Sequence, residues 1–118
     1  MGLESWLEQT AELRKTLEIY GKSPISTDIG ERQNDMDIAI QHADDAGRLR
    51  ADCQSFLTQG TAQAVLKWSK QDEFTYEDRK ALVRQDVNNL KRLLDGMKIT
   101  EGLIKIRIYV LMNLNRSR

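Results

Sequence analysis

The chain has 118 residues, 40% of them hydrophobic and 31% charged, and its 18 basic and 18 acidic side chains leave no net charge. A chain of this length can bury one core. A composition with one proline and one cysteine excludes collagen-like proteins and disulfide scaffolds, and the share of hydrophobic residues argues against wholesale disorder. We therefore expect a single folded domain over residues 1–118.

The balanced total hides a gradient of charge along the chain. Residues 1–47 carry 4 basic and 10 acidic side chains, a net charge of −6, whereas residues 98–118 carry 5 basic and 1 acidic, a net charge of +4. The two ends can attract each other within the fold, or the basic end can meet phosphates or an acidic partner. The sequence leaves both interpretations open.

The cellular location is predicted from two further features. The only cysteine, Cys53, can close no intramolecular disulfide, and no secretory signal pattern opens the sequence, so we expect a reducing, cytoplasmic location. The longest apolar run, residues 103–114, contains Lys105 and Arg107 and is shorter than the roughly 18 residues that a membrane-spanning helix needs. No membrane span is therefore predicted.

Apolar residues at three- and four-residue steps predict a first helix over residues 3–20. Gly21 suits a helix C-terminus, and Pro24 disfavours helix at the residue before it, so the helix should end there. The next helix should begin near Ser26 to Asp28, because serine, threonine and aspartate are good N-caps.

The second helix is predicted as a long spine over residues 28–59, ending at Gly60. Its middle is built of small residues, which let a neighbouring helix cross closely: Ala39, Ala43, Ala46 and Gly47. A short helix follows within residues 61–70, unless these residues continue the spine after a kink. A longer one should cover residues 76–95, since Thr75 offers an N-cap hydroxyl ahead of acidic residues in the first turn, and Gly96 can cap or kink it.

The last segment has an ambiguous pattern. Apolar residues alternate from Ile104 to Leu114 as in a half-buried strand, and β-branched side chains favour a strand. Polar residues at three- and four-residue steps indicate a helix instead: Lys98, Glu101, Gly102, Lys105, Tyr109 and Asn113. We predict a helix, because a lone strand would lack a partner in this chain and its open edge would invite aggregation. The predicted fold is an all-α bundle of four to five helices.

Few residues suggest chemistry. His42 and Asp45 share a helix flank while Asp44 points elsewhere, which is too few ligands for a metal site. Cys53 lies on an apolar stripe with no histidine near it in sequence, as a buried structural cysteine does. No phosphate-binding glycine loop, Walker lysine or nucleophile-elbow motif is present. We therefore expect no enzyme activity, no cofactor and no metal.

The two tryptophans, Trp6 and Trp68, each lie on an apolar stripe at helical spacing. We expect both side chains to be mostly buried in the core. The alternative is an anchoring role at a partner interface, where tryptophan is enriched.

Three charges fall inside the apolar stripes of predicted helices: Arg50, Asp86 and Arg107. Burying a charge without a partner costs on the order of several kcal/mol. The signs predict a buried or interfacial pair of Asp86 with Arg50 or Arg107, since a guanidinium can hold a carboxylate bidentately. The alternative is that the arginine stems extend to water and Asp86 lies at an edge.

The C-terminal helix is predicted to be apolar over more than half its circumference, which is more than a small bundle covers. We expect this surface to bind a protein partner or a second copy of the chain, with a homo-oligomer expected. The residues assigned to the contact are Ile104, Arg107, Ile108, Val110, Leu111 and Leu114. The function indicated is a non-catalytic intracellular interaction module, such as an adaptor, chaperone, inhibitor or assembly subunit.

The alternative function is a helical accessory protein that binds nucleic acid through the basic C-terminal segment. Cations there pair with phosphates, and Tyr109 can stack on a base: Lys98, Lys105, Arg107, Arg116 and Arg118. Five cations over this length are thinly spread, and a pI near 6.6 is low for such a protein. The protein-interaction hypothesis is therefore favoured.

Overall fold

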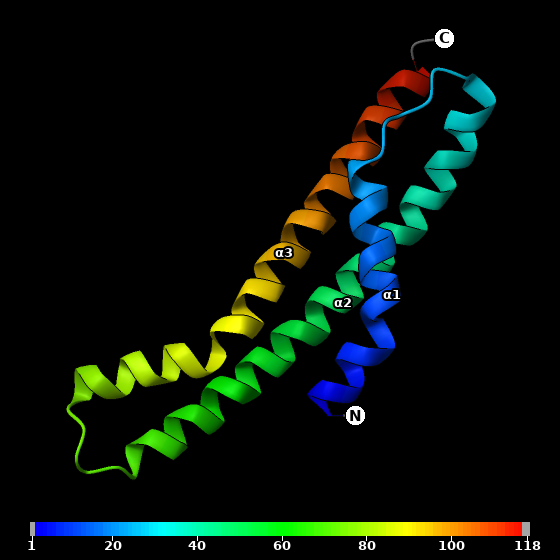
Figure 1. Ribbon diagram of the computed structural model, residues 1–118. Coiled ribbons are helices and arrows are strands. Elements are labelled where there is room, and N and C mark those ends of the chain that lie inside the picture. The colour runs from blue at the N-terminus through cyan, green and yellow to red at the C-terminus, as the bar shows by residue number, and fades with distance from the viewer. Residues whose placement is uncertain (1, 117–118) are drawn as a thin grey trace. The chain divides into compact units, whose positions relative to one another are not determined.

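The computed structural model describes residues 2–116 and shows three α-helices (Figure 1). α1 spans Leu3–Lys22, α2 spans Ile29–Ser69 and α3 spans Tyr76–Arg116. Residues 2–116 contain no β-strand. The all-α prediction is confirmed, including the helical assignment of residues 103–114, whereas the predicted count of four to five helices is wrong.

The count is wrong because Gly60 and Gly96 do not end helices. α2 runs through Gly60 and joins the predicted spine of residues 28–59 to the predicted helix in residues 61–70, and α3 runs through Gly96. No glycine in residues 2–116 has a positive φ, so none forms the left-handed cap that terminates a helix. A glycine inside a helix costs only about 1 kcal/mol relative to alanine, which a long packed helix tolerates.

The helix ends follow the local chemistry that the sequence indicated. The Asp28 carboxylate accepts the N–H of Glu31 at 3.2 Å and caps α2. The Thr75 hydroxyl accepts the N–H of Asp78 at 3.2 Å, and the Asp78 carboxylate accepts the N–H of Thr75 at 3.4 Å. This reciprocal pair is a capping box at the start of α3. Both predicted helix starts are confirmed.

The chain divides into two compact units. Unit 1 comprises residues 1–50 and 97–118, and unit 2 comprises residues 51–96, so that α2 and α3 each contribute to both. The expectation of a single domain over residues 1–118 stays a prediction.

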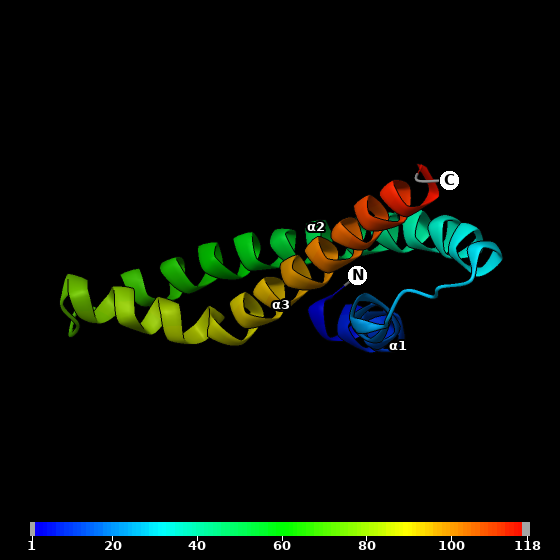
Figure 2. The same ribbon diagram turned by 90° about the horizontal axis from the view of Figure 1, so that it is seen from above.

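In unit 1, α1 packs against one side of the pair formed by the first part of α2 and the last part of α3 (Figure 2). The core comes from all three helices: Trp6, Leu17, Ala39, Ala46, Leu49, Met97, Ile104 and Leu111. The small residues of α2 lie where helices meet, as predicted, since Ala46 lines the same small hollow as Leu17 of α1 and Thr100 of α3. The opposite side of the α2–α3 pair is not covered by α1.

In unit 2, the end of α2 and the start of α3 bury Cys53, Ala64 and Leu94. The Trp68 indole packs edge-on against Phe74, with ring centroids 5.7 Å apart. Trp6 is buried as expected, but Trp68 is only partly buried, because this end of unit 2 has two helices to enclose it. Over residues 2–116, no helix combines the length and apolar character that a membrane span requires.

Candidate protein-interaction surface

The three charges in apolar stripes have partners other than the predicted ones. Arg107 of α3 pairs with Asp35 of α2, and Arg50 of α2 pairs with Glu101 of α3. Asp86, in unit 2, accepts a hydrogen bond from the Trp68 indole at 2.7 Å and lies 3.7 Å from the Lys67 ammonium. Each of the three charges therefore has an ionic partner, but the predicted pairing of Asp86 with Arg50 or Arg107 is corrected.

Among the described residues of unit 1, Arg107 is the most enclosed cation, with a side chain 8% exposed. Its Nη2 donates to Asp35 Oδ2 at 2.8 Å, and its Nε donates to Oδ2 at 3.1 Å and to Oδ1 at 3.3 Å, so that both carboxylate oxygens are engaged in a bidentate contact. Nη1 donates to the carbonyl oxygens of Tyr20 and Ser23, and Nη2 also donates to that of Pro24. Arg107 therefore joins α3 to α2 and to the connection after α1, and its donors are occupied within the chain.

Tyr20 completes this cluster. Its hydroxyl donates to the Asp35 carboxylate, the Arg107 guanidinium lies over its ring at 4.5 Å, and the His42 ring packs edge-on at 4.6 Å. Burial raises the pKa of Tyr20, and the hydrogen bond to Asp35 and its negative charge add to this, to about 12. Burial alone would lower the pKa of Arg107, but the hydrogen bond and charge of Asp35 prevail and raise it. The cluster is a structural clamp in which every charge is paired.

The raised pKa of Tyr20 predicts a loss of stability at high pH. The folded state keeps the phenolic proton up to a pKa of about 12, whereas the unfolded chain releases it near the ordinary value of 10.0. The contribution of the neutral phenol to the free energy of unfolding is therefore fully present below pH 10. It is lost as the pH rises from 10 through 12. We expect a loss of about 1 to 2 kcal/mol, less than the full shift implies because Tyr20 is partly exposed. Urea unfolding at stepped pH measures it.

The matched variant for this experiment is Tyr20→Phe, which keeps the ring but has no proton to lose. Its stability should fall less steeply than that of the wild type above pH 10. Parallel curves for the two proteins would show that Tyr20 titrates alike in the folded and unfolded chain.

Glu101 anchors a second polar cluster in unit 1. Glu101 is 7% exposed, and its two carboxylate oxygens accept hydrogen bonds from Arg50 Nε at 2.7 Å and Lys105 Nζ at 2.8 Å. Burial alone would raise the pKa of Glu101, but the hydrogen bonds and charges of Lys105 and Arg50 lower it. The sequence pattern had assigned Glu101 to the exposed polar stripe of this helix, and the structure corrects that assignment.

The residues predicted to bind a partner divide into two groups. Ile104 and Leu111 are 0% exposed, and Arg107 belongs to the clamp, so these three serve the fold of unit 1. Ile108 is partly buried, while Val110 and Leu114 are exposed. α3 meets α1 and α2 along this stretch, which accounts for the burial of the first group. A partner contact at the other three residues stays a prediction.

A different side of α3 is exposed and apolar. We call it the α3 outer stripe and define it as Ile99, Gly102, Ile106, Tyr109 and Val110. Ile99, Ile106 and Tyr109 are 65%, 61% and 66% exposed. The five residues follow one another at steps of three, four or one, which places them on one side of the helix. Of the five, only Val110 had been assigned to the predicted protein contact. Gly102 and Tyr109 had been placed on the polar stripe of this helix, and Tyr109 was also a candidate for base stacking.

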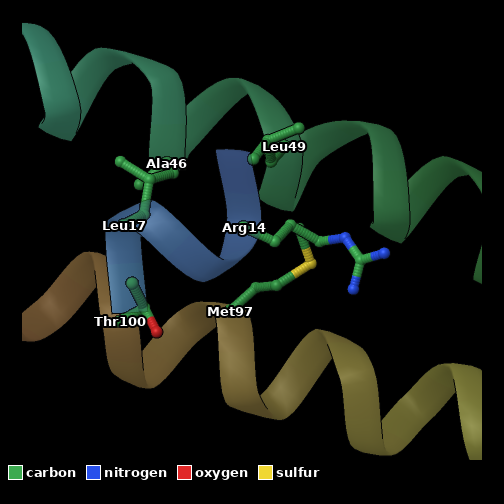
Figure 3. Close-up of a pocket in the computed structure, with 6 residues that line it drawn as sticks. All are labelled: Arg14, Leu17, Ala46, Leu49, Met97 and Thr100. Carbon is green, nitrogen blue, oxygen red and sulfur yellow. The ribbon is translucent and has the colours of Figure 1, made fainter. Parts of the chain in front are cut away.

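Unit 1 also contains a small hollow between its three helices (Figure 3). Its volume is about 20 Å³, enough for one water molecule and too small for an organic ligand. The Arg14 side chain lines the hollow with its stem, while its guanidinium donates to the Leu7 carbonyl at 2.9 Å and to the Thr10 hydroxyl at 3.1 Å. The hollow is a packing defect of the core.

The remaining polar groups do not assemble a reactive centre. Within residues 2–116, no three His, Cys, Asp or Glu side chains converge as metal ligands do. Asp44 and Asp45 are both bound by Arg48, at 2.8 and 3.0 Å. Cys53 is fully buried, and its thiol lies 3.9 Å from the Leu90 carbonyl oxygen.

The basic C-terminal segment is partly engaged in the fold. Arg107 is held by Asp35 and Lys105 by Glu101, while Arg118 lies outside the described residues. Lys98 and Arg116 are exposed. This weakens the nucleic-acid alternative, since a phosphate-binding surface needs several cations whose donors are available.

No protein-family model, no curated protein and no solved structure matches this chain.

Proposed function

We propose that this protein is a non-catalytic interaction module that binds an α-helix of a protein partner along the α3 outer stripe. The observation that supports the proposal is the exposure of Ile99, Ile106 and Tyr109 on one side of a helix whose opposite side is buried in unit 1. Contiguous apolar surface of this kind costs hydration free energy and is typical of interaction sites. The expected cytoplasmic location is part of the proposal.

The spacing of the stripe suits a helical partner. Ile99, Gly102, Leu103 and Ile106 stand at positions i, i+3, i+4 and i+7, which together form the hole that receives one side chain of a neighbouring helix. Tyr109 and Val110 repeat the positions of Gly102 and Leu103 seven residues later. Two holes at a heptad interval match the knobs of one packed helix.

Gly102 makes the first hole deep. A Cβ placed on Gly102 would meet nothing within 4 Å, so the space above this residue is open. A large partner side chain can therefore rest against the α3 backbone, as small residues allow at close helix crossings. The proposal thus predicts that filling this space blocks binding while leaving the fold intact.

Site-specific photo-crosslinking in the source cells tests the proposal. Ile106 is replaced by p-benzoylphenylalanine, and the control places the same crosslinker at Gln9, an exposed position on α1. We expect a discrete covalent adduct with a protein at position 106 and none at position 9. The adduct should disappear when Gly102→Leu is added, because leucine fills the hole.

A stability measurement accompanies the crosslinking. Gly102→Leu should unfold at the same or a higher temperature than the wild type, since leucine favours helix more than glycine does and has open space here. Adducts of equal yield at positions 106 and 9, or an adduct at position 106 that persists in the folded Gly102→Leu protein, would contradict the proposal.

A further inference from the structure

The charges around the α3 outer stripe indicate which kind of helix it binds. From Met97 to Arg116 the chain carries four basic residues and one acidic residue, a net charge of +3. The acid, Glu101, is buried and held by Arg50 and Lys105, and Arg107 is neutralised by Asp35. The charges that this part of α3 exposes are therefore all positive: Lys105 is exposed but shares Glu101, and Lys98 and Arg116 are exposed as well.

These cations have regular positions beside the stripe. Lys98 and Lys105 are seven residues apart and line one flank, each directly preceding Ile99 or Ile106. Arg116 is seven residues after Tyr109 and extends the row formed by Gly102 and Tyr109. In helix pairs, charged residues that flank the apolar seam select the partner through opposite charges.

We propose that the occupant of the α3 outer stripe is an acidic amphipathic helix of another protein, with apolar residues at heptad spacing and Asp or Glu on its flanks. This inference rests on the proposed function. A second copy of the chain fits less well, because two α3 stripes placed together would bring cation against cation along the seam and offer no exposed acid from Met97 to Arg116 to pair with them.

Binding of synthetic helices tests the inference directly. One probe is an amphipathic peptide of about three heptads, roughly 30 Å as a helix, with leucine on its apolar side and glutamate on its flanks. The matched probe has lysine in place of each glutamate. We expect the full chain to bind the glutamate peptide at least about tenfold more tightly at low salt, with the preference shrinking as salt rises.

Charge reversal on α3 provides the sharpest comparison. The double variant Lys98→Glu/Arg116→Glu should lose about tenfold in affinity for the glutamate peptide and gain affinity for the lysine peptide. The control Lys15→Glu/Lys70→Glu makes the same change in net charge at exposed positions that do not belong to the stripe or its flank on α3, and it should keep the wild-type preference. Gly102→Leu should abolish binding of the glutamate peptide.

The outcomes separate this inference from the proposed function. Equal binding of both peptides, with crosslinking at position 106 intact, would overturn the acidic partner and leave the interaction module standing. A dimer in sedimentation velocity that Gly102→Leu dissociates would assign the stripe to a second copy and would also overturn the inference. The inference of an acidic helical partner would also be wrong if phosphatidylserine-containing vesicles bind through Lys98 and Arg116 while the glutamate peptide does not bind.

Discussion

Asp35→Ala is expected to lower the free energy of unfolding by about 3 to 5 kcal/mol, because it leaves the Arg107 guanidinium enclosed without its counter-ion. The Arg107 side chain is 8% exposed, and Asp35 accepts its bidentate contact together with the Tyr20 hydroxyl. Urea unfolding measures the loss. Fluorescence of Trp6 in a Trp68→Phe background reports on unit 1.

Two comparisons show whether the loss arises from the pair. Glu18→Ala breaks an exposed ion pair with Lys22, whose side chains are 61% and 66% exposed, and should cost less than about 0.5 kcal/mol. Asp35→Leu combined with Arg107→Met should recover much of the stability, since no buried charge then remains. A coupling free energy below about 0.5 kcal/mol between Asp35 and Arg107 would contradict the clamp.

Leu111→Ala is expected to lower the free energy of unfolding by about 2 to 5 kcal/mol, because the side chain is 0% exposed and its removal leaves a cavity in the core of unit 1. Ile106→Ala, five residues earlier on the same helix, should cost less than about 1 kcal/mol because Ile106 is 61% exposed. Chemical denaturation of the isolated protein measures both.

The same two variants should behave in the opposite way toward a partner. Ile106→Ala should weaken the crosslink or peptide binding at the α3 outer stripe, while the folded fraction of Leu111→Ala should bind as the wild type does. Equal losses of stability at positions 106 and 111 would mean that Ile106 is packed within the chain, and the docking surface would then have to lie elsewhere.

Local features of this fold were predictable from the sequence because their causes are local. The start of α2 at Ile29 follows from the Asp28 cap, and the start of α3 at Tyr76 follows from the Thr75 hydroxyl. The end of α1 near Pro24 and the helical state of residues 103–114 were likewise available from backbone chemistry and spacing. Each depends on residues within a turn or two.

Helix length was harder to predict because its determinants are not local. Gly60 has the local character of a helix end, yet α2 continues through it. The cost of one glycine is about 1 kcal/mol, and packing along the rest of the helix exceeds it. Sequence spacing shows the cost at Gly60 but not the contacts that compensate for it.

The partners of buried charges were decided by the tertiary structure alone. The sequence by itself determined that Arg50 and Arg107 stand in apolar stripes and need counter-ions. Their counter-ions, Glu101 and Asp35, are 51 and 72 residues away in the chain. Which acid meets which arginine depends on how the helices are rotated against one another, because a rotation of one residue step moves a side chain by about 100° around its helix. The same rotation buries Leu111 and leaves Ile106 exposed, so only the packed helices show which side of α3 remains for a partner.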